Sequence, residues 1–312
     1  MNLPLEFISN VQGVLQEDGR RYVDALPDLV AEASVQWGLT DVQPVPNLSY
    51  NFVAFANRGE SQVILKIGLP NRETWSEMAA LRLFNGEGAC KLLEYDKEKY
   101  WMLLERLNPG VMLATMEDDE QATHIAAEVM KRIWRGLDTS FATNAQDYST
   151  NNDNSNFIQL TDWFFGGFER LRKMFNGGTG PLDGKLVERT ESSVKDFFAE
   201  NHSPVLMHGD FHHFNVLSSE RGWLVIDPKG VIGPAGYEVG PFMMNPWGSF
   251  SDGISRQLIE KRIDILHEHL GFERERIREW TLAHAVLSAW WGIEDSTGWE
   301  YSQAFAELIA SI

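Results

Sequence analysis

The chain has 312 residues, enough for two lobes or domains, and its 43% hydrophobic and 23% charged residues are usual for a globular protein. Its 27 Lys and Arg residues against 45 Asp and Glu residues give a net charge of −18. This acidity argues against nucleic acid or an anionic membrane surface as a partner, because both need clustered basic side chains. It would attract small cationic molecules, although an acidic surface also simply keeps a protein dissolved.

Cys90 is the single cysteine of the sequence, so no disulfide can form within the chain and nothing requires an oxidising compartment. The first residues, MNLPLEFISNVQ, lack the basic and apolar regions of a signal peptide. No run approaches the roughly 18 apolar residues of a membrane-spanning helix. We therefore expect a cytoplasmic protein.

The first predicted element is a helix over residues 17–37, where apolar residues recur at helical intervals. Pro27 predicts a break or a kink inside this helix. Three strand-like runs follow, and the turn RGE between the second and the third predicts a β-hairpin. These runs are VQPVP, FVAFAN and SQVILKIG, at residues 42–46, 52–57 and 61–68.

A second helix is predicted over residues 71–88, with Thr74 and Glu77 in a capping pattern near its start and glycines closing it. A second hairpin, CKLLEYDKEKYWMLLERL, follows at residues 90–107. The first 107 residues therefore predict a small antiparallel sheet that one helix interrupts.

Beyond this point the composition favours helices, and the asparagine-rich residues 144–156 predict a surface loop between two of them. Two long helices are expected to close the chain. We therefore expect an α+β protein of two lobes, with a β-rich small lobe at residues 1–107 and a mainly helical lobe at residues 108–312. The first helices of the larger lobe are expected at roughly 118–137, 157–176 and 183–200.

The stretch HGDFHHFNVL, residues 208–217, concentrates residue types that carry chemistry. Its three histidines could indicate a zinc site, but neither a cysteine nor a second ligand cluster accompanies them. It could also be a structural strand with hydrogen-bonded histidines. That interpretation leaves the intervals between Asp210, Asn215 and the later Asp227 unexplained.

Asp210 and Asn215 have the H-x-D-x-x-x-x-N spacing of a kinase catalytic loop. A predicted hairpin follows and ends on Asp227, so Asn215 and Asp227 emerge at the ends of adjacent strands, where both can bind Mg²⁺ on nucleotide phosphates. Asp210 is placed one loop away, where it can accept a proton from a substrate hydroxyl. Phosphoryl transfer needs positioning and charge neutralisation more than covalent chemistry, so these three groups form a sufficient catalytic core.

A kinase also needs a strand lysine for the phosphates and a helix carboxylate that holds it. Lys66 lies in the apolar strand VILKIG, where an unpaired ammonium would be costly; on its own it would be interpreted as an edge-strand lysine that reaches solvent. Glu77 in the following helix is its expected partner. Glu73, one turn earlier on the same face, could simply favour the helix dipole.

The segment LLERLNPG lies where the two predicted lobes meet. Backbone groups from Glu105 to Leu107 are expected to hydrogen-bond an adenine edge, with apolar side chains covering the ring. No glycine-rich loop is present to cover the phosphates. The segment PNLSYNF, between the first strands, offers Ser49 and Asn51 instead.

Two blocks, HGDFHHFNVL and WLVIDPKGVIGPAGYEVGPFMMNP, resemble the aminoglycoside/hydroxyurea antibiotic-resistance kinases, a group that includes the streptomycin phosphotransferases. The family pattern runs HGDLHHGN, then IDPKG, then an aromatic residue followed by Asp or Glu, then NP. GACKLLEYD, MLLERLNPG and LSAWWGIED extend the match in order along the chain. The resemblance implies a bilobal, protein-kinase-like fold and ATP- and Mg²⁺-dependent phosphorylation of a hydroxyl on a small molecule.

The resemblance also implies a role for each residue that matches the family motifs. The sequence departs from the pattern at Phe211 and Phe214, where leucine and glycine are expected, and Phe214 could reshape the substrate mouth. The implied roles are catalytic base for Asp210, magnesium ligand for Asn215 and Asp227, nucleotide-phosphate contact for Lys66 with Glu77 behind it, support of the catalytic loop for His208, and a cation of the cleft for Lys229.

Streptomycin-like substrates carry guanidinium groups, which favour carboxylates and flat aromatic faces. The segment SAWWGIEDSTGW offers Trp291, Glu294 and Asp295, of which the first and last lie one helical turn apart on a shared face. Alternatively, the tryptophans belong to the core and the acids to a solvated helix end. Glu238 either faces the cleft or ties down the loop after DPKG, and we favour the structural role.

Three functions compete. The first is a kinase acting on an aminoglycoside or a related cationic aminocyclitol, and the second is the same chemistry on a different, metabolic hydroxyl substrate. The third is a nucleotide-binding pseudokinase scaffold, which is disfavoured because pseudokinases usually lack one of the Lys, Asp, Asn and Asp groups that are all present here. The sequence gives no indication of the oligomeric state.

Overall fold

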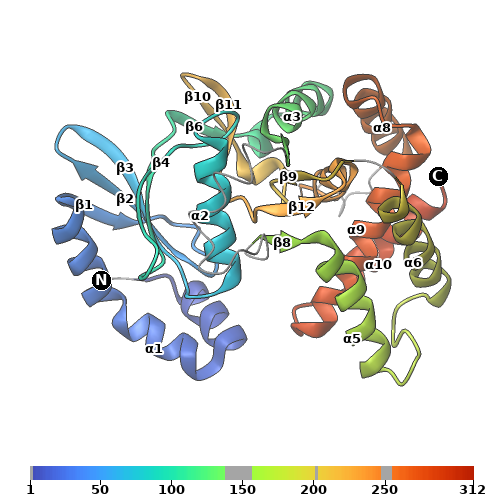
Figure 1. Cartoon of the computed structure of the whole chain (residues 1–312), viewed down its shortest axis with the longest axis horizontal. Coiled ribbons are helices and arrows are strands. Elements are labelled where there is room, and N and C mark those ends of the chain that lie inside the picture. The colour runs from blue at the N-terminus through green and yellow to red at the C-terminus, as the bar shows by residue number, and fades with distance from the viewer. Residues whose placement is uncertain (1–2, 138–156, 201–202, 247–254) are drawn as a thin grey trace.

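The computed structural model describes residues 3–137, 157–200, 203–246 and 255–312, arranged as in Figure 1. Its N-terminal part holds an antiparallel sheet of five strands in the order β1-β2-β3-β5-β4. Both predicted hairpins lie in this sheet, and Gly59 turns the first of them with a positive φ of 58°. The strands are β1 (Leu39–Pro44), β2 (Phe52–Arg58), β3 (Ser61–Ile67), β4 (Leu92–Asp96) and β5 (Trp101–Glu105).

The helix α1 (Leu5–Trp37) packs on one face of this sheet. Helical backbone continues through Pro27, and the interruption lies at Gln16 instead, whose φ of 50° and ψ of −119° are not helical. The interruption separates two helical segments. The predicted helix over residues 17–37 matches the second of them, and the first, which begins at Leu5, was not predicted. The buried Tyr22 hydroxyl joins it to the sheet by donating to the Ile67 carbonyl at 2.6 Å and accepting from the Phe52 amide at 2.9 Å.

The helix α2 (Arg72–Phe84) lies between the five-stranded sheet and the rest of the chain (Figure 1). Its N-cap is Asn71, whose side-chain oxygen accepts from the Thr74 amide at 2.9 Å. The predicted capping pair of Thr74 and Glu77 is therefore wrong: Thr74 already lies inside the helix, and the Glu77 carboxylate binds Lys66 instead of a backbone amide.

Alternation along the strands separates two hydrophobic clusters. Leu65 of β3 and Leu103 of β5 face α1 and form one cluster with it. Met102 and Leu104 face the opposite way and belong to a second cluster, which includes most of the apolar side chains of α2 and continues through the C-terminal part. Lys66 lies opposite Met102 in the β3–β5 pairing and shares the α2 side of the sheet.

The C-terminal part contains two small sheets and most of the helices. β6 (Pro109–Met112), β10 (Val216–Ser219) and β11 (Gly222–Val225) form one sheet, and β7 (Arg135–Gly136), β9 (Val205–Met207), β12 (Val231–Gly233) and β8 (Ile158–Gln159) form the other, in these orders. The helices are α3 (Asp119–Ile133), α5 (Gly167–Met174), α6 (Gly184–Ala199), α7 (Val239–Met243), α8 (Arg256–Leu270), α9 (Arg274–Glu294) and α10 (Glu300–Ala310), with a π-helical turn at Asp162–Gly166 and 3-10 turns at Leu113–Thr115, His213–Asn215 and Ala235–Glu238.

Three helices end the described chain where two were expected. Gly298, with a φ of 103°, lies in the turn that separates α9 from α10. The chain returns so closely that a Cβ atom on Gly292 would lie 2.0 Å from the Gly298 carbonyl oxygen. The predicted helix at 157–176 begins instead with β8 and the π-helical turn, and the predicted loop at 144–156 lies outside the described residues.

The α+β composition expected from the sequence is confirmed. The five-stranded sheet ends at Glu105, and the next strand, β6, pairs with β10 in the C-terminal part. Of the helices in the described ranges, none combines the length and apolarity needed to cross a lipid bilayer.

Candidate active site

The buried ammonium group of Lys66 binds two carboxylates. Its Nζ atom lies 2.7 Å from each Glu77 side-chain oxygen and also donates to the Asp227 carboxylate. Burial alone would lower the pKa of Lys66, but Asp227 and Glu77 outweigh it and raise the pKa. Burial raises the pKa of Glu77 to about 7, against the opposing effect of Lys66. Strand β3, helix α2 and the loop after β11 thus each contribute one charged side chain to a single ion-pair cluster.

The segment after β9 forms a loop that His208 braces from inside. The His208 Nε2 atom lies 2.9 Å from the Ile226 carbonyl oxygen, and its Nδ1 atom accepts from the Asp210 amide at 3.1 Å. These two bonds assign the proton to Nε2. Burial lowers the pKa of His208 to about 4, so the ring stays neutral and links the Asp210 loop to the strand that leads to Asp227.

Glu238 holds the same loop in place through the loop's backbone amides. Its carboxylate is fully buried and accepts from the backbone amides of His208 at 2.8 Å and Gly209 at 2.9 Å. Gly209 has a φ of 84°, and a Cβ atom there would lie 2.2 Å from a Val231 methyl carbon, so the loop requires glycine. Of the two roles considered for Glu238, this geometry favours the structural one.

Asn215 connects the Asp210 loop to the hairpin that ends at Asp227. Its Nδ2 atom donates to the Asp210 carbonyl oxygen at 3.0 Å, and its backbone oxygen accepts from the Ile226 amide at 3.0 Å. Among the described residues, no hydrogen bond occupies its Oδ1 atom. Asp227 adopts a φ of 57°, a strained conformation for a residue other than glycine and one that is concentrated at functional sites.

A cavity of about 430 Å³ lies between the two parts of the chain, with Lys66, Glu77, Asn215 and Asp227 in its wall. Phe214, which was expected to reshape the substrate mouth, also lines this cavity. The remaining wall is mostly apolar, as a nucleotide base requires. It includes Val45, Val53, Phe55, Ile64, Leu104, Leu107, Met112, Leu217 and Ile226.

Of the backbone groups expected to contact adenine, the Glu105 amide is already hydrogen-bonded and, in the described part of the chain, those of Leu107 are not. The Glu105 amide already donates to the Lys91 carbonyl at 2.9 Å, and the Glu105 carboxylate pairs with Arg221, so Glu105 holds the wall of the cavity together. Leu107, in contrast, makes no backbone hydrogen bond within the described residues. Ser49 and Asn51 both line the cavity, but Asn51 Oδ1 also accepts from the Leu69 amide at 3.3 Å.

A second cavity, of about 500 Å³, lies beside the loop that contains Gly209, Asp210 and His212, the catalytic loop expected from the sequence. Asp210, Trp291 and Asp295 line it, as the sequence suggested for an acceptor site, and Glu73 and Lys229 lie at its wall. Burial does not keep Asp210 neutral, because His212 and Lys229 hold its pKa below the ordinary value. The Asp210 side chain is therefore a carboxylate.

Glu294 does not line this cavity. Its side chain binds Arg170, with Oε2 at 3.0 Å from Nη2, because it points away from the helix face that carries Trp291 and Asp295. Sequence reasoning missed Trp163, which lines the cavity and meets Trp291 edge to face at 5.2 Å between ring centroids. An isolated tryptophan in a helix-like tract gave no signal of this position.

The histidine-built metal site considered for the motif is not formed. Within the described residues, no three His, Cys, Asp or Glu side chains are grouped so that they could hold a metal ion. His213 instead stacks on Phe242 at 4.3 Å between ring centroids, and burial lowers its pKa. Asn215 and Asp227 offer two oxygen donors at one cavity, which is the donor set that Mg²⁺ takes when phosphates complete its shell.

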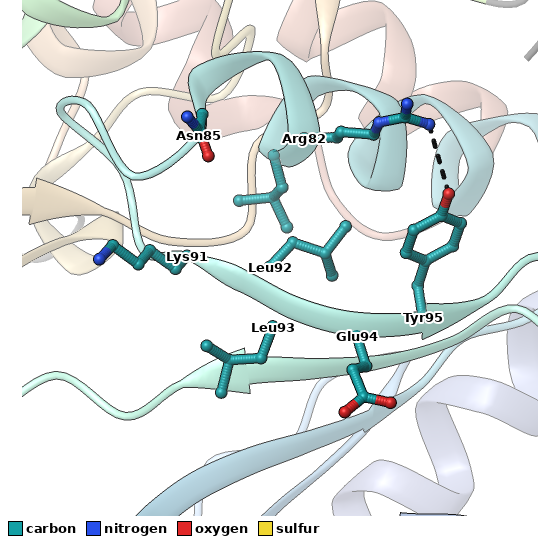
Figure 2. A pocket seen from close by; sticks show the side chains of 8 residues that line it. Arg82, Asn85, Lys91, Leu92, Leu93, Glu94 and Tyr95 are labelled. Atoms are coloured by element: carbon teal, nitrogen blue, oxygen red, sulfur yellow. Dashed lines mark hydrogen bonds between the residues drawn. The ribbon is translucent and has the colours of Figure 1, made fainter. Parts of the chain in front are cut away.

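A third hollow lies between α2 and β4, away from these groups (Figure 2). Arg82 from α2 reaches over it to the Tyr95 hydroxyl at 3.3 Å, and Leu92 lies beneath. It shares no lining residue with the two cavities that flank the catalytic loop.

A five-stranded sheet carrying a buried Lys–Glu pair, above a loop with Asp and Asn that precedes a second Asp, defines a phosphotransferase of the protein-kinase-like class. The profile of the family described as aminoglycoside/hydroxyurea antibiotic resistance kinase matches residues 36–296. The chain belongs to this family, and the resemblance seen in its motifs is confirmed.

Individual relatives agree with this assignment. A streptomycin 6-kinase of Streptomyces griseus is 30% identical over 290 residues, which cover 89% of this chain and 87% of that protein. A hydroxyurea phosphotransferase of Kitasatospora aureofaciens is 30% identical over 289 residues, covering 89% and 76%. The solved structure of aminoglycoside phosphotransferase APH(4)-Ia superimposes with a TM-score of 0.58 at 14% identity, over 92% of this chain and 98% of that one, which confirms the expected fold. The protein is a kinase, and its phosphoryl donor is a nucleotide.

Proposed function

We propose that this kinase transfers the γ-phosphoryl group of MgATP to a hydroxyl of a streptomycin-like aminoglycoside or a related cationic aminocyclitol. The observation that carries the proposal is the position of Asp210 between two cavities. Asp210 lines the cavity of about 500 Å³, which we call the acceptor cavity. Its carbonyl oxygen is hydrogen-bonded to Asn215 in the wall of the cavity of about 430 Å³, which we call the nucleotide cavity. The names of the relatives supply the substrate class.

In the proposed reaction, the acceptor oxygen attacks the γ-phosphorus atom and its proton passes to the Asp210 carboxylate. The bond between the γ-phosphorus and the β-bridging oxygen breaks, and ADP leaves with that electron pair. Lys66, held by Glu77, contacts the phosphates. Asn215 and Asp227 would hold Mg²⁺, which supplies charge neutralisation on the phosphates when it is bound.

The proposal also assigns a task to each part of the chain. Residues 1–107 bind the nucleotide, with Leu107 at the adenine edge and Ser49 and Asn51 near the phosphates. Residues 108–312 supply the catalytic groups and the acceptor site. Because ATP is the donor, we place the enzyme in the cytoplasm, and its acidic surface favours a small cationic substrate over nucleic acid.

Two other functions are distinguished from this one by experiment. One is the same chemistry on a different hydroxyl-bearing metabolite, and hydroxyurea belongs among the candidates because one relative is a hydroxyurea phosphotransferase. The other is a pseudokinase, which is disfavoured because Lys66 and Glu77 are paired and Asn215 and Asp227 share one cavity.

The test is ADP release from MgATP with streptomycin, other aminoglycosides, hydroxyurea and neutral sugars, with the product identified by phosphorus NMR. Asp210→Asn should lower kcat by about 10²- to 10⁴-fold while MgATP affinity stays within a few-fold, since it removes a general base and keeps the side-chain size. Asp24→Asn, on the exposed face of α1, serves as the control. Turnover close to wild type in Asp210→Asn would refute the assignment of the base. ADP release with hydroxyurea or a neutral sugar, but with neither streptomycin nor any other aminoglycoside, would refute the substrate class.

A further inference from the structure

An ion pair between the two parts of the chain lies at the wall of the acceptor cavity. The Lys229 Nζ atom is 3.2 Å from Glu73 Oε2. Glu73 belongs to the first turn of α2, and Lys229 follows Asp227 by two residues. Neither residue has a task in the reaction proposed above.

The backbone at Lys229 is held by two hydrogen bonds, whereas its side chain is held, within the described parts of the chain, by a single ion pair. The amides of Lys229 and Gly230 both donate to the His208 carbonyl oxygen, at 2.8 and 3.2 Å. Glu73 is the one ion-pair partner of the Lys229 ammonium group among the residues that the structure describes. Lys229 lines the same cavity as Asp210, and against the opposing effect of burial the charges of Glu73, Asp227 and Asp210 raise the pKa of its ammonium group.

Besides Asp210, Glu73 shares the acceptor cavity with one more carboxylate and two tryptophans. Asp295 lines the same cavity, and Trp163 and Trp291 form its aromatic wall. Carboxylates and aromatic faces are what a guanidinium or ammonium group binds. A cationic acceptor that enters this cavity therefore competes with Lys229 for Glu73.

We propose that a cationic group of the acceptor replaces Lys229 on Glu73, and that the released Lys229 ammonium group then contacts the phosphoryl group being transferred. Glu73 is the positioning residue of this exchange and Lys229 is catalytic. Binding of the acceptor thereby releases the cation that promotes phosphorylation of the acceptor. When no acceptor is bound, Glu73 holds Lys229, and the attack of water on the phosphoryl group is slow. This inference rests on the proposed function, whose cationic acceptor it uses.

The test is hydrolysis of MgATP to ADP and phosphate without any acceptor, where water replaces the hydroxyl as the attacking group. Glu73→Gln frees Lys229 permanently and should raise this rate about fivefold, the upper range for an ion pair whose side chains are 34% and 56% exposed. Lys229→Met should lower kcat for transfer to streptomycin by about 100-fold. It should lower acceptor-free hydrolysis by less, because Glu73 already holds most of the Lys229 ammonium group there. In Glu73→Gln/Lys229→Met the gain should vanish, because Glu73 acts through Lys229.

Asp162→Asn is the matched control, because it breaks the neighbouring ion pair of α2, that of Arg72 and Asp162 at 3.0 Å, and leaves Lys229 in place. Its acceptor-free hydrolysis should equal that of the wild type. An unchanged rate in Glu73→Gln, an equal rise in Asp162→Asn, or a gain that survives in the double variant would each overturn the inference. These rates need no acceptor, so failure of the wild type to phosphorylate streptomycin would count against the proposed substrate alone.

Discussion

Replacing Lys66 by methionine tests the ion pair on which the site is built. Lys66 is 3% exposed and Glu77 4%, so the variant leaves a carboxylate buried without its cation. Removing one partner of a buried ion pair costs about 3–5 kcal/mol of unfolding free energy. The loss should be measured at pH 8, above the value of about 7 to which burial raises the pKa of Glu77 in the wild type, so that the wild-type pair is ionised.

Urea unfolding of the wild type, Lys66→Met and Lys66→Met/Glu77→Met gives the comparison. The double variant replaces the pair by two apolar side chains of similar length and should recover most of the stability, although both variants should lack activity. Lys97→Met removes a lysine from an exposed pair and should change stability by less than about 1 kcal/mol. If the single and double variants unfold at the same urea concentration, the two side chains are not energetically coupled and the reasoning fails.

Two further predictions concern the loop and the acceptor cavity. The folded-state pKa of Glu238, about 7, lies above the ordinary value of 4.5, so its contribution to stability is complete below pH 4.5 and is lost as the pH rises through 7. Unfolding free energy of the wild type should therefore fall by about 3 kcal/mol relative to Glu238→Gln across that interval, and parallel curves in urea titrations at several pH values would contradict this. Asp295→Asn should raise the KM for streptomycin about fivefold with kcat retained, whereas Glu294→Gln, next to it but outside the cavity, should not; equal effects of the two variants would show that the cavity does not select the cation.

The paired strands and the site motifs were predictable because they depend on short-range patterns. Alternation and a turn glycine predicted the β2–β3 hairpin, and the buried position of Lys66 called for a carboxylate within reach, which Glu77 supplies. The start of α1 was not predictable, since Pro4 at its N-cap makes no side-chain cap and the break at Gln16 has no sequence signal.

The acceptor cavity shows where sequence reasoning ends. Glu294 and Asp295 are neighbours, yet one binds Arg170 and the other lines the cavity, because one residue along a helix turns the side chain by about 100°. Choosing between them requires the rotation of α9 against its neighbours, which depends on packing across the whole C-terminal part. Trp163 enters the cavity for the same reason, from a π-helical turn that the sequence did not predict.

The two hydrophobic clusters imply that the cooperative unfolding units do not divide at residue 107, the boundary expected from the sequence. One cluster joins α1 to a single face of the sheet, while the cluster on the other face runs through α2 into the C-terminal helices. Cooperative opening follows buried contacts and not chain order. Amide hydrogen exchange should therefore show α2 protected together with α9, and α1 exchanging as a separate, less protected unit, so that a fragment ending at residue 107 would carry its central helix without the partners that hold it folded.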